Sequence, residues 1–275
     1  MRLTVSSFLL LIPVALGQGA CQRATGYCQT SADCSSGLVC NIGNGTCQGA
    51  ASSDLGTSGD LAGTVQRLGV RINPPIVSAA GDFFGSSVAA TSAFAVIGAY
   101  LTTKGQGAAY AVDLSGTTAG PAISLPPPLN ADALVPYDYF GVSVSAYGNT
   151  IAVGASGKDA TKGAVYIYSK VGTTLTGPVV KLVAPDTATN DYFGGAVSLY
   201  GDTLVVGAAS KTGFQGAAYV FSRVNGTWLP GVRVPSPLDG ALTTYDYFGQ
   251  QVATNGAYVA VSAPGRQNSR GAVYL

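Results

Sequence analysis

The most constraining feature of this sequence is a Phe-Gly pair that returns at nearly even intervals. Each copy follows an aspartate and an aromatic residue, and successive copies lie 56, 53 and 55 residues apart. The four pairs are Phe84-Gly85, Phe140-Gly141, Phe193-Gly194 and Phe248-Gly249. A period near fifty residues is typical of arrays in which each unit buries its apolar face against its neighbours. The sequence therefore predicts four similar units over residues 63–275.

Each unit carries the same order of strand signals. After Phe-Gly comes an alternating stretch, then a two-residue turn such as Gly148-Asn149, then a dense apolar run such as TIAVGAS from Thr150. A polar loop follows, then a stretch such as GAVYIYS from Gly163, and a looser fourth segment. This order predicts an all-β chain built from four-stranded antiparallel sheets, which are the blades of a β-propeller. We expect the second strand of each blade to be buried on both faces.

The recurring residues around Phe-Gly have structural interpretations. We expect the Phe to fill the space between neighbouring blades, and the Gly to permit close backbone approach or a bend. An aspartate precedes them once per unit, which favours turn capping through backbone N–H bonds over catalysis or metal binding. These aspartates are Asp82, Asp138, Asp191 and Asp246.

The order Phe-Gly, Gly-Ala, Gly-Ala-x-Tyr resembles the FG-GAP repeats of the integrin α-subunit N-terminal propeller, and more closely the plain FG-GAP repeat proteins of microbes. The resemblance covers residues 63–275 and implies an extracellular propeller used for binding, often in adhesion. Integrin blades often carry an Asp-rich calcium loop in the first hairpin. The equivalent turns here hold at most one aspartate, Asp202, whereas calcium takes about six to eight oxygen ligands. We therefore carry over no metal site and expect no cofactor.

The number of blades is left open by the sequence. Integrin propellers have seven blades, and four repeats are present here. The segment GTVQRLGVRI, residues 63–72, resembles the fourth segment of a repeat and lies where an integrin-type propeller takes the outer strand of its last blade. The repeats form either a closed four-bladed ring or part of a longer propeller.

The N-terminal residues indicate a secreted protein. Residues 1–17 contain Arg2, a short apolar run over residues 8–16, and small residues before Gln18, as in a cleaved signal peptide. A membrane anchor is the alternative, but the run is shorter than the roughly 20 residues that span a bilayer. We therefore expect a secreted, extracellular chain with no membrane span.

All five cysteines fall within residues 18–48, at Cys21, Cys28, Cys34, Cys40 and Cys47. Such density in a secreted chain predicts a small disulfide-rich module, similar to cysteine-rich modules of the dickkopf N-terminal type. The connectivity is open, and the odd number leaves one cysteine to stay unpaired or to bond another chain. Residues 49–62 are rich in Ser, Gly and Ala and predict a flexible linker.

The composition limits the kinds of function that this chain can have. The chain has no histidine, which removes the commonest general base and every Ser-His or Cys-His nucleophile arrangement. A net charge of +1 gives no overall field to attract nucleic acid. We expect no enzymatic activity. The two Asn-Gly-Thr sequons, at Asn44 and Asn225, predict N-glycosylation if the source is eukaryotic.

The loops between second and third strands concentrate positive charge. Against one acid, Asp159, they hold six basic residues: Lys104, Lys158, Lys162, Lys211, Arg266 and Arg270. We expect these to form an exposed basic rim for an extracellular ligand, either an anionic glycan or a carboxylate on a protein. The predicted function is a binding or adhesion module. The alternatives are the non-catalytic propeller part of a larger glycan- or lipid-active enzyme, and a purely structural extracellular protein.

Overall fold

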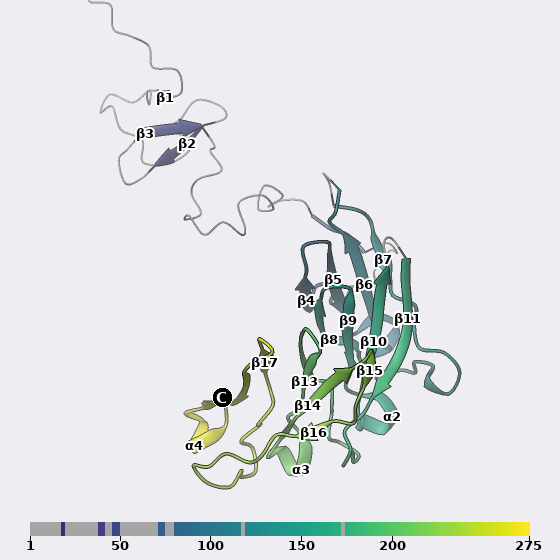
Figure 1. Cartoon of the computed structure of the whole chain (residues 1–275), viewed down its shortest axis with the longest axis vertical. Helices are drawn as coiled ribbons and strands as arrows, with labels where there is room; N and C mark the ends of the chain where they lie inside the picture. Colours follow the sequence, from purple (N-terminus) through teal and green to yellow (C-terminus); the bar gives the residue numbers. More distant parts are fainter. Residues whose placement is uncertain are drawn as a thin grey trace, which may run out of the picture. The chain divides into compact units, whose positions relative to one another are not determined.

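The computed structural model describes residues 71–74, 80–116, 119–171 and 174–275, with three short strands nearer the N-terminus (Figure 1). The chain divides into two compact units, Met1–Gly69 and Val70–Leu275. In the first, β1 (Gln18–Gly19), β3 (Thr46–Gly49) and β2 (Leu38–Asn41) form an antiparallel sheet in that order, and its register sets Cys40 opposite Cys47. The predicted signal peptide, the linker beyond Gly49, and the residues Cys21, Cys28, Cys34 and Asn44 lie outside the described residues.

The second unit contains four antiparallel sheets, one for each Phe-Gly repeat, which we call blades 1 to 4 (Figure 1). Blade 1 comprises β4 (Ser87–Ala90), β5 (Phe94–Ala99), β6 (Ala108–Asp113) and β7 (Ala122–Ser124). Blade 2 comprises β8 (Phe140–Tyr147), β9 (Thr150–Ala155), β10 (Ala164–Val171) and β11 (Thr174–Leu182). Blade 3 comprises β12 (Ala196–Tyr200), β13 (Thr203–Ala208), β14 (Ala217–Val224), β15 (Thr227–Trp228) and β16 (Val232–Arg233). Blade 4 comprises β17 (Val252–Thr254), β18 (Val259–Ala263) and β19 (Ala272–Tyr274).

Strands follow one another across each sheet in chain order, which confirms the predicted all-β meander. In blade 3, both β15 and β16 pair with β14, and β16 takes the place of the fourth strand. Residues 71–74 form no strand, and the rest of the outer strand expected near residues 63–72 lies outside the described residues. None of the helices in the described part of the chain is long and apolar enough to cross a membrane.

The second strands hold the core of the array. Almost every residue of β5, β9 and β13 is buried, as expected for strands covered on both faces. The expectation is wrong for β18 of blade 4, where only Val261 and Ala263 are buried. One apolar cluster joins blades 1 and 2, and another joins blades 2 and 3. Phe140, Phe193 and Phe248 are fully buried, whereas Phe84 of blade 1 is half-buried.

Neighbouring blades approach so closely that a side chain is excluded at one position of the second strands of blades 1, 2 and 3. A Cβ on Gly98, Gly154 or Gly207 would lie 2.0, 2.1 or 1.9 Å from the carbonyl oxygen of the next blade's Phe-Gly glycine. The hydroxyls of Ser87 and Ser143 donate to the same carbonyls, at 2.8 and 2.7 Å. The backbone of the Phe-Gly turn in blades 2, 3 and 4 therefore rests directly on the preceding sheet.

Candidate functional site

The loops between second and third strands form one connected surface with the Asp-aromatic-Phe-Gly turns. Each loop contains a short helical turn: α1 (Thr102–Gly105), α2 (Lys158–Thr161), α3 (Lys211–Phe214) and α4 (Arg266–Ser269). The N–H groups of Tyr139, Tyr192 and Tyr247, in the turns of blades 2, 3 and 4, donate to carbonyls of the preceding blade's loop at 2.8–2.9 Å. We call this surface, made of the four helical turns and the four Phe-Gly turns, the loop face.

An unusual backbone makes these contacts between blades. Three consecutive residues of each helical turn have positive φ; in α2 these are Asp159, Ala160 and Thr161, at 53°, 58° and 64°. A left-handed conformation costs a residue with a Cβ roughly 1–2 kcal/mol. The third carbonyl of the run, such as that of Thr161, accepts the N–H of the next blade's turn. The hydrogen bonds between blades thus offset part of the backbone strain.

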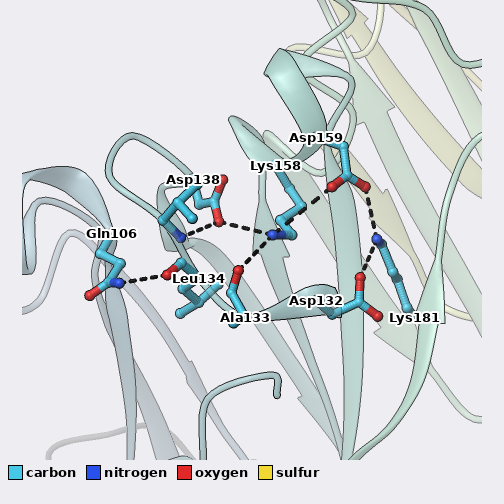
Figure 2. Close-up of polar contacts among 9 residues, drawn as sticks. Gln106, Asp132, Ala133, Leu134, Asp138, Lys158, Asp159 and Lys181 are labelled. Carbon is cyan, nitrogen blue, oxygen red and sulfur yellow. Dashed lines mark hydrogen bonds and ion pairs between the residues drawn. The ribbon is translucent and has the colours of Figure 1, made fainter. Parts of the chain in front are cut away.

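A buried ion pair fastens the loop of blades 2, 3 and 4 to its own Phe-Gly turn. The pairs are Lys158–Asp138 at 3.2 Å, Lys211–Asp191 at 2.7 Å and Arg266–Asp246 at 2.8 Å. Each basic side chain also donates to a backbone carbonyl of the loop that enters its blade, at 2.7–2.9 Å. Figure 2 shows the arrangement in blade 2, where the Lys158 ammonium lies between Asp138 and the carbonyl of Ala133.

The aspartates of these pairs also cap the turns that enter their blades. Asp138, Asp191 and Asp246 each accept a backbone N–H from three residues earlier, at 2.7–2.8 Å. Burial raises the pKa of Asp246, but the bonds from Thr243 and Arg266 outweigh it, so the net pKa is lowered. The aspartates therefore serve as structural acceptors.

The structure corrects the expected exposure of the basic rim. Lys158, Lys211 and Arg266 are only 4%, 5% and 6% exposed. They occupy the first position of the helical turn, where the side chain turns inward to the aspartate; blade 1 has Thr102 there. The other three predicted residues, Lys104, Lys162 and Arg270, are exposed on the loop face. A basic residue that accompanies the recurring aspartate in three repeats was the sequence signal for this pairing.

A second charged cluster lies at the outer edge of the loop face in blade 2. Lys181 on β11 binds Asp159 at 2.8 Å and also contacts Asp132, which lies in the loop entering the blade (Figure 2). Gln106 of blade 1 donates to the carbonyl of Leu134 in the same loop, at 2.6 Å. Neither Asp132 nor Lys181 was singled out from the sequence.

Aromatic rings, four of them exposed and three half-buried, form two groups on the loop face, and sequence reasoning missed them. The first group joins blades 1 and 2 and contains Phe83, Tyr100, Tyr137 and Tyr139. The second joins blades 3 and 4 and contains Phe214, Tyr245 and Tyr247, with the Phe214 and Tyr245 rings stacked at 5.6 Å. Tyr137 and Tyr245 are 63% and 58% exposed. The tyrosine that precedes the aspartate in two repeats was the available signal.

The remaining predicted sites have simple surroundings. Asn225 is exposed, with Gly226 in the turn between β14 and β15, where both residues have positive φ. Among the described residues, no group of three or more acidic, histidine or cysteine side chains is placed to hold a metal ion.

Comparison with protein families agrees with this repeated architecture. The model of the FG-GAP repeat matches four times, over residues 77–119, 129–168, 177–221 and 237–275. Each match contains one Phe-Gly pair, the first two strands of its blade and all or part of the third. No curated protein matches the sequence significantly. The four matches together cover more than half of the chain, which therefore belongs to the FG-GAP repeat family.

Proposed function

We propose that this chain is an extracellular binding module that takes its ligand on the loop face. The observation that carries the proposal is the pair of exposed aromatic groups on loops held by hydrogen bonds between blades. Exposed apolar patches rimmed by polar residues mark interaction sites. Tyrosine suits such sites because it offers a large contact area at a small cost in conformational entropy. The rings of Tyr137 and Tyr245 pack against other rings of the loop face, yet each remains more than half exposed.

The charges of the loop face favour an acidic ligand. Lys104, Lys162 and Arg270 are exposed, and the single acid of these loops, Asp159, is held by Lys181. An anionic glycan or an acidic protein surface would meet aromatic rings and unopposed positive charge together. Exposed charges are screened at physiological salt, so the attraction should be modest and should weaken as salt is added.

Secretion and the absence of catalysis are part of the same proposal. The signal-like N-terminus and the clustered cysteines support an extracellular location, and FG-GAP repeats are typical of extracellular proteins. The lack of histidine supports binding without chemistry. A purely structural role gives no reason for Tyr137 and Tyr245 to stay more than half exposed.

The test is a binding screen of the secreted protein against extracellular proteins and glycans. Replacing Tyr137 and Tyr245 with Ser should lower the affinity for a true ligand at least tenfold. The matched control replaces Tyr147 and Tyr200, an exposed tyrosine pair at the first-to-second strand turns of blades 2 and 3, and should leave binding unchanged.

A second variant tests the charge of the ligand. Changing Lys104, Lys162 and Arg270 to Ser should reduce both the affinity and its dependence on salt. Equal binding by the wild type and the Tyr137/Tyr245 variant would exclude the loop face as the ligand site.

A further inference from the structure

The tyrosine of the third strand is held in the same way in blades 2, 3 and 4. Tyr166, Tyr219 and Tyr274 each pack against the Phe of their own Phe-Gly pair, with ring centroids 5.6–5.9 Å apart. Because the ring is fixed by this contact, the position of the hydroxyl group is fixed as well.

The hydroxyl groups differ in their partners. Tyr219 donates to Asp186 at 2.6 Å, and Tyr274 donates to Asp239 at 3.0 Å. Both aspartates belong to the loop that enters the blade. The hydroxyl of Tyr166 is buried and has no hydrogen-bond partner in the part of the chain that the structure describes. A buried polar group without a partner is unfavourable, so this hydroxyl is an unused hydrogen-bonding position.

The reason lies in the aspartate of blade 2. Asp132, in the loop that enters the blade, contacts Lys181, which lies directly opposite Tyr166 in the strand register. In blade 3, Arg233 occupies the register position of Lys181, and Asp186 binds both Arg233 and the tyrosine hydroxyl. In blade 2, by contrast, Asp132 contacts Lys181 and forms no hydrogen bond with the Tyr166 hydroxyl.

A pocket of about 370 Å³ lies at this point, within the range of small-molecule sites. It is lined by Tyr166, Asp132, Lys181, Asn130, Leu129 and Val180, among others. The lining thus offers a hydroxyl, a carboxylate, an ammonium and an amide, together with aliphatic surface. Such a lining matches a molecule with several hydroxyl groups and an apolar ring face.

The charges of the pocket disfavour an anion. Lys181 is shared by two carboxylates, those of Asp132 and Asp159, so the cluster carries a net negative charge. Burial, followed by the nearby aspartates, raises the pKa of Tyr166, which keeps its hydroxyl protonated as a donor. We propose that this pocket binds a neutral saccharide unit, with one sugar hydroxyl accepting from Tyr166 and another donating to Asp132.

The exposed side of the cluster gives the ligand its path. The Asp132 side chain is 39% exposed and ends a single 3-10 turn, Asn130–Asp132, so it can turn aside and admit a sugar hydroxyl to Tyr166. This site is separate from the two aromatic groups, and it goes beyond the function proposed above without resting on it.

The test is ligand-observed NMR and titration of the full-length protein with the methyl glycosides of glucose, galactose and mannose, and with glucuronic acid. At least one neutral glycoside should bind the wild type. Tyr166→Phe should weaken it at least tenfold, whereas the matched variant Tyr219→Phe should not. Without ligand, Tyr166→Phe should melt no lower than the wild type, while Tyr219→Phe should melt lower because it removes a formed hydrogen bond.

Four outcomes with the wild type and the two Phe variants would overturn the proposal, and a fifth comes from the Tyr137/Tyr245 variant. The four are no binding of any neutral glycoside, equal binding by Tyr166→Phe, tighter binding of glucuronic acid than of glucose, and equal destabilisation by the two Phe variants. The Tyr137/Tyr245 variant separates this site from the loop face, since it should keep glycoside binding; loss of binding there would place the saccharide on the aromatic groups instead.

Discussion

Replacing Gly154 with Ala should separate blades 2 and 3. The new Cβ would lie 2.1 Å from the carbonyl oxygen of Gly194 and 2.3 Å from the Ser143 hydroxyl oxygen. A separation of 3.0 Å is about the shortest that real Cβ atoms show, so blade 3 must retreat by about 0.9 Å. Overpacking of this kind costs about 1–3 kcal/mol. The retreat also breaks the 2.7 Å bond from Ser143 to Gly194, which contributes about 1 kcal/mol.

The expected loss is therefore about 2–4 kcal/mol, or a fall in melting temperature of roughly 5–15 °C for a unit of this size. Gly195→Ala is the matched control, because a Cβ there meets only the carbonyl of Tyr192, at 3.4 Å. Its free energy of unfolding should stay within about 0.5 kcal/mol of the wild type. Thermal and urea unfolding measure both variants. If Gly154→Ala unfolds like the control, the blades do not touch through this backbone contact.

Three further predictions concern single residues. Phe193→Ala should lower the free energy of unfolding by about 3–5 kcal/mol, because it empties a fully buried site. Phe84→Ala should lower it by less, because Phe84 is only half-buried, and an equal loss in the two variants would contradict this reasoning. Lys211→Met leaves its aspartate partner buried and unpaired, which should cost about 3–5 kcal/mol, whereas Lys104→Met on the exposed loop should change stability by less than about 0.5 kcal/mol. The pKa of Asp246 is lowered in the folded state, so its contribution to the free energy of unfolding is present above the ordinary carboxyl pKa. That contribution is lost as the pH falls through the lower pKa of the folded state. Urea unfolding at a series of pH values from 6 to 2 should show this decline, and unchanged stability at pH 2 would oppose it.

The architecture followed from the sequence because its signals are local and repeated. The Phe-Gly period, the two-residue turns and the apolar second strands predict four antiparallel meanders, and each appears in the structure. The turns form where Gly148 and Gly201 adopt positive φ. Repetition makes the strand prediction more reliable, because a unit with weak signals can be assigned from its alignment with the other three.

The loop face was harder to predict because its character depends on contacts between segments distant in the sequence. Lys158 and Asp138 lie twenty residues apart, and only the fold shows that the lysine is buried against the carboxylate. Charge counting treats every lysine in a polar loop as exposed. The aromatic groups likewise form between blades, where Tyr137 of blade 2 meets residues of blade 1.

The glycine that brings blades together is absent from the fourth blade, and this bears on what can pack there. Gly98, Gly154 and Gly207 each lie beneath the next blade's Phe-Gly turn, and Ser262 stands at the equivalent position of β18. Its hydroxyl accepts the N–H of Gln251, at 2.9 Å. Gln251 stands at the position of Ser87 and Ser143, so blade 4 lacks the serine hydroxyl that binds the next Phe-Gly turn in blades 1 and 2. A Phe-Gly turn seated as in blades 2 to 4 would meet the Ser262 Cβ at about the 2 Å calculated for the glycines. Whatever covers this face of blade 4 must therefore approach it differently from the way each blade approaches its predecessor.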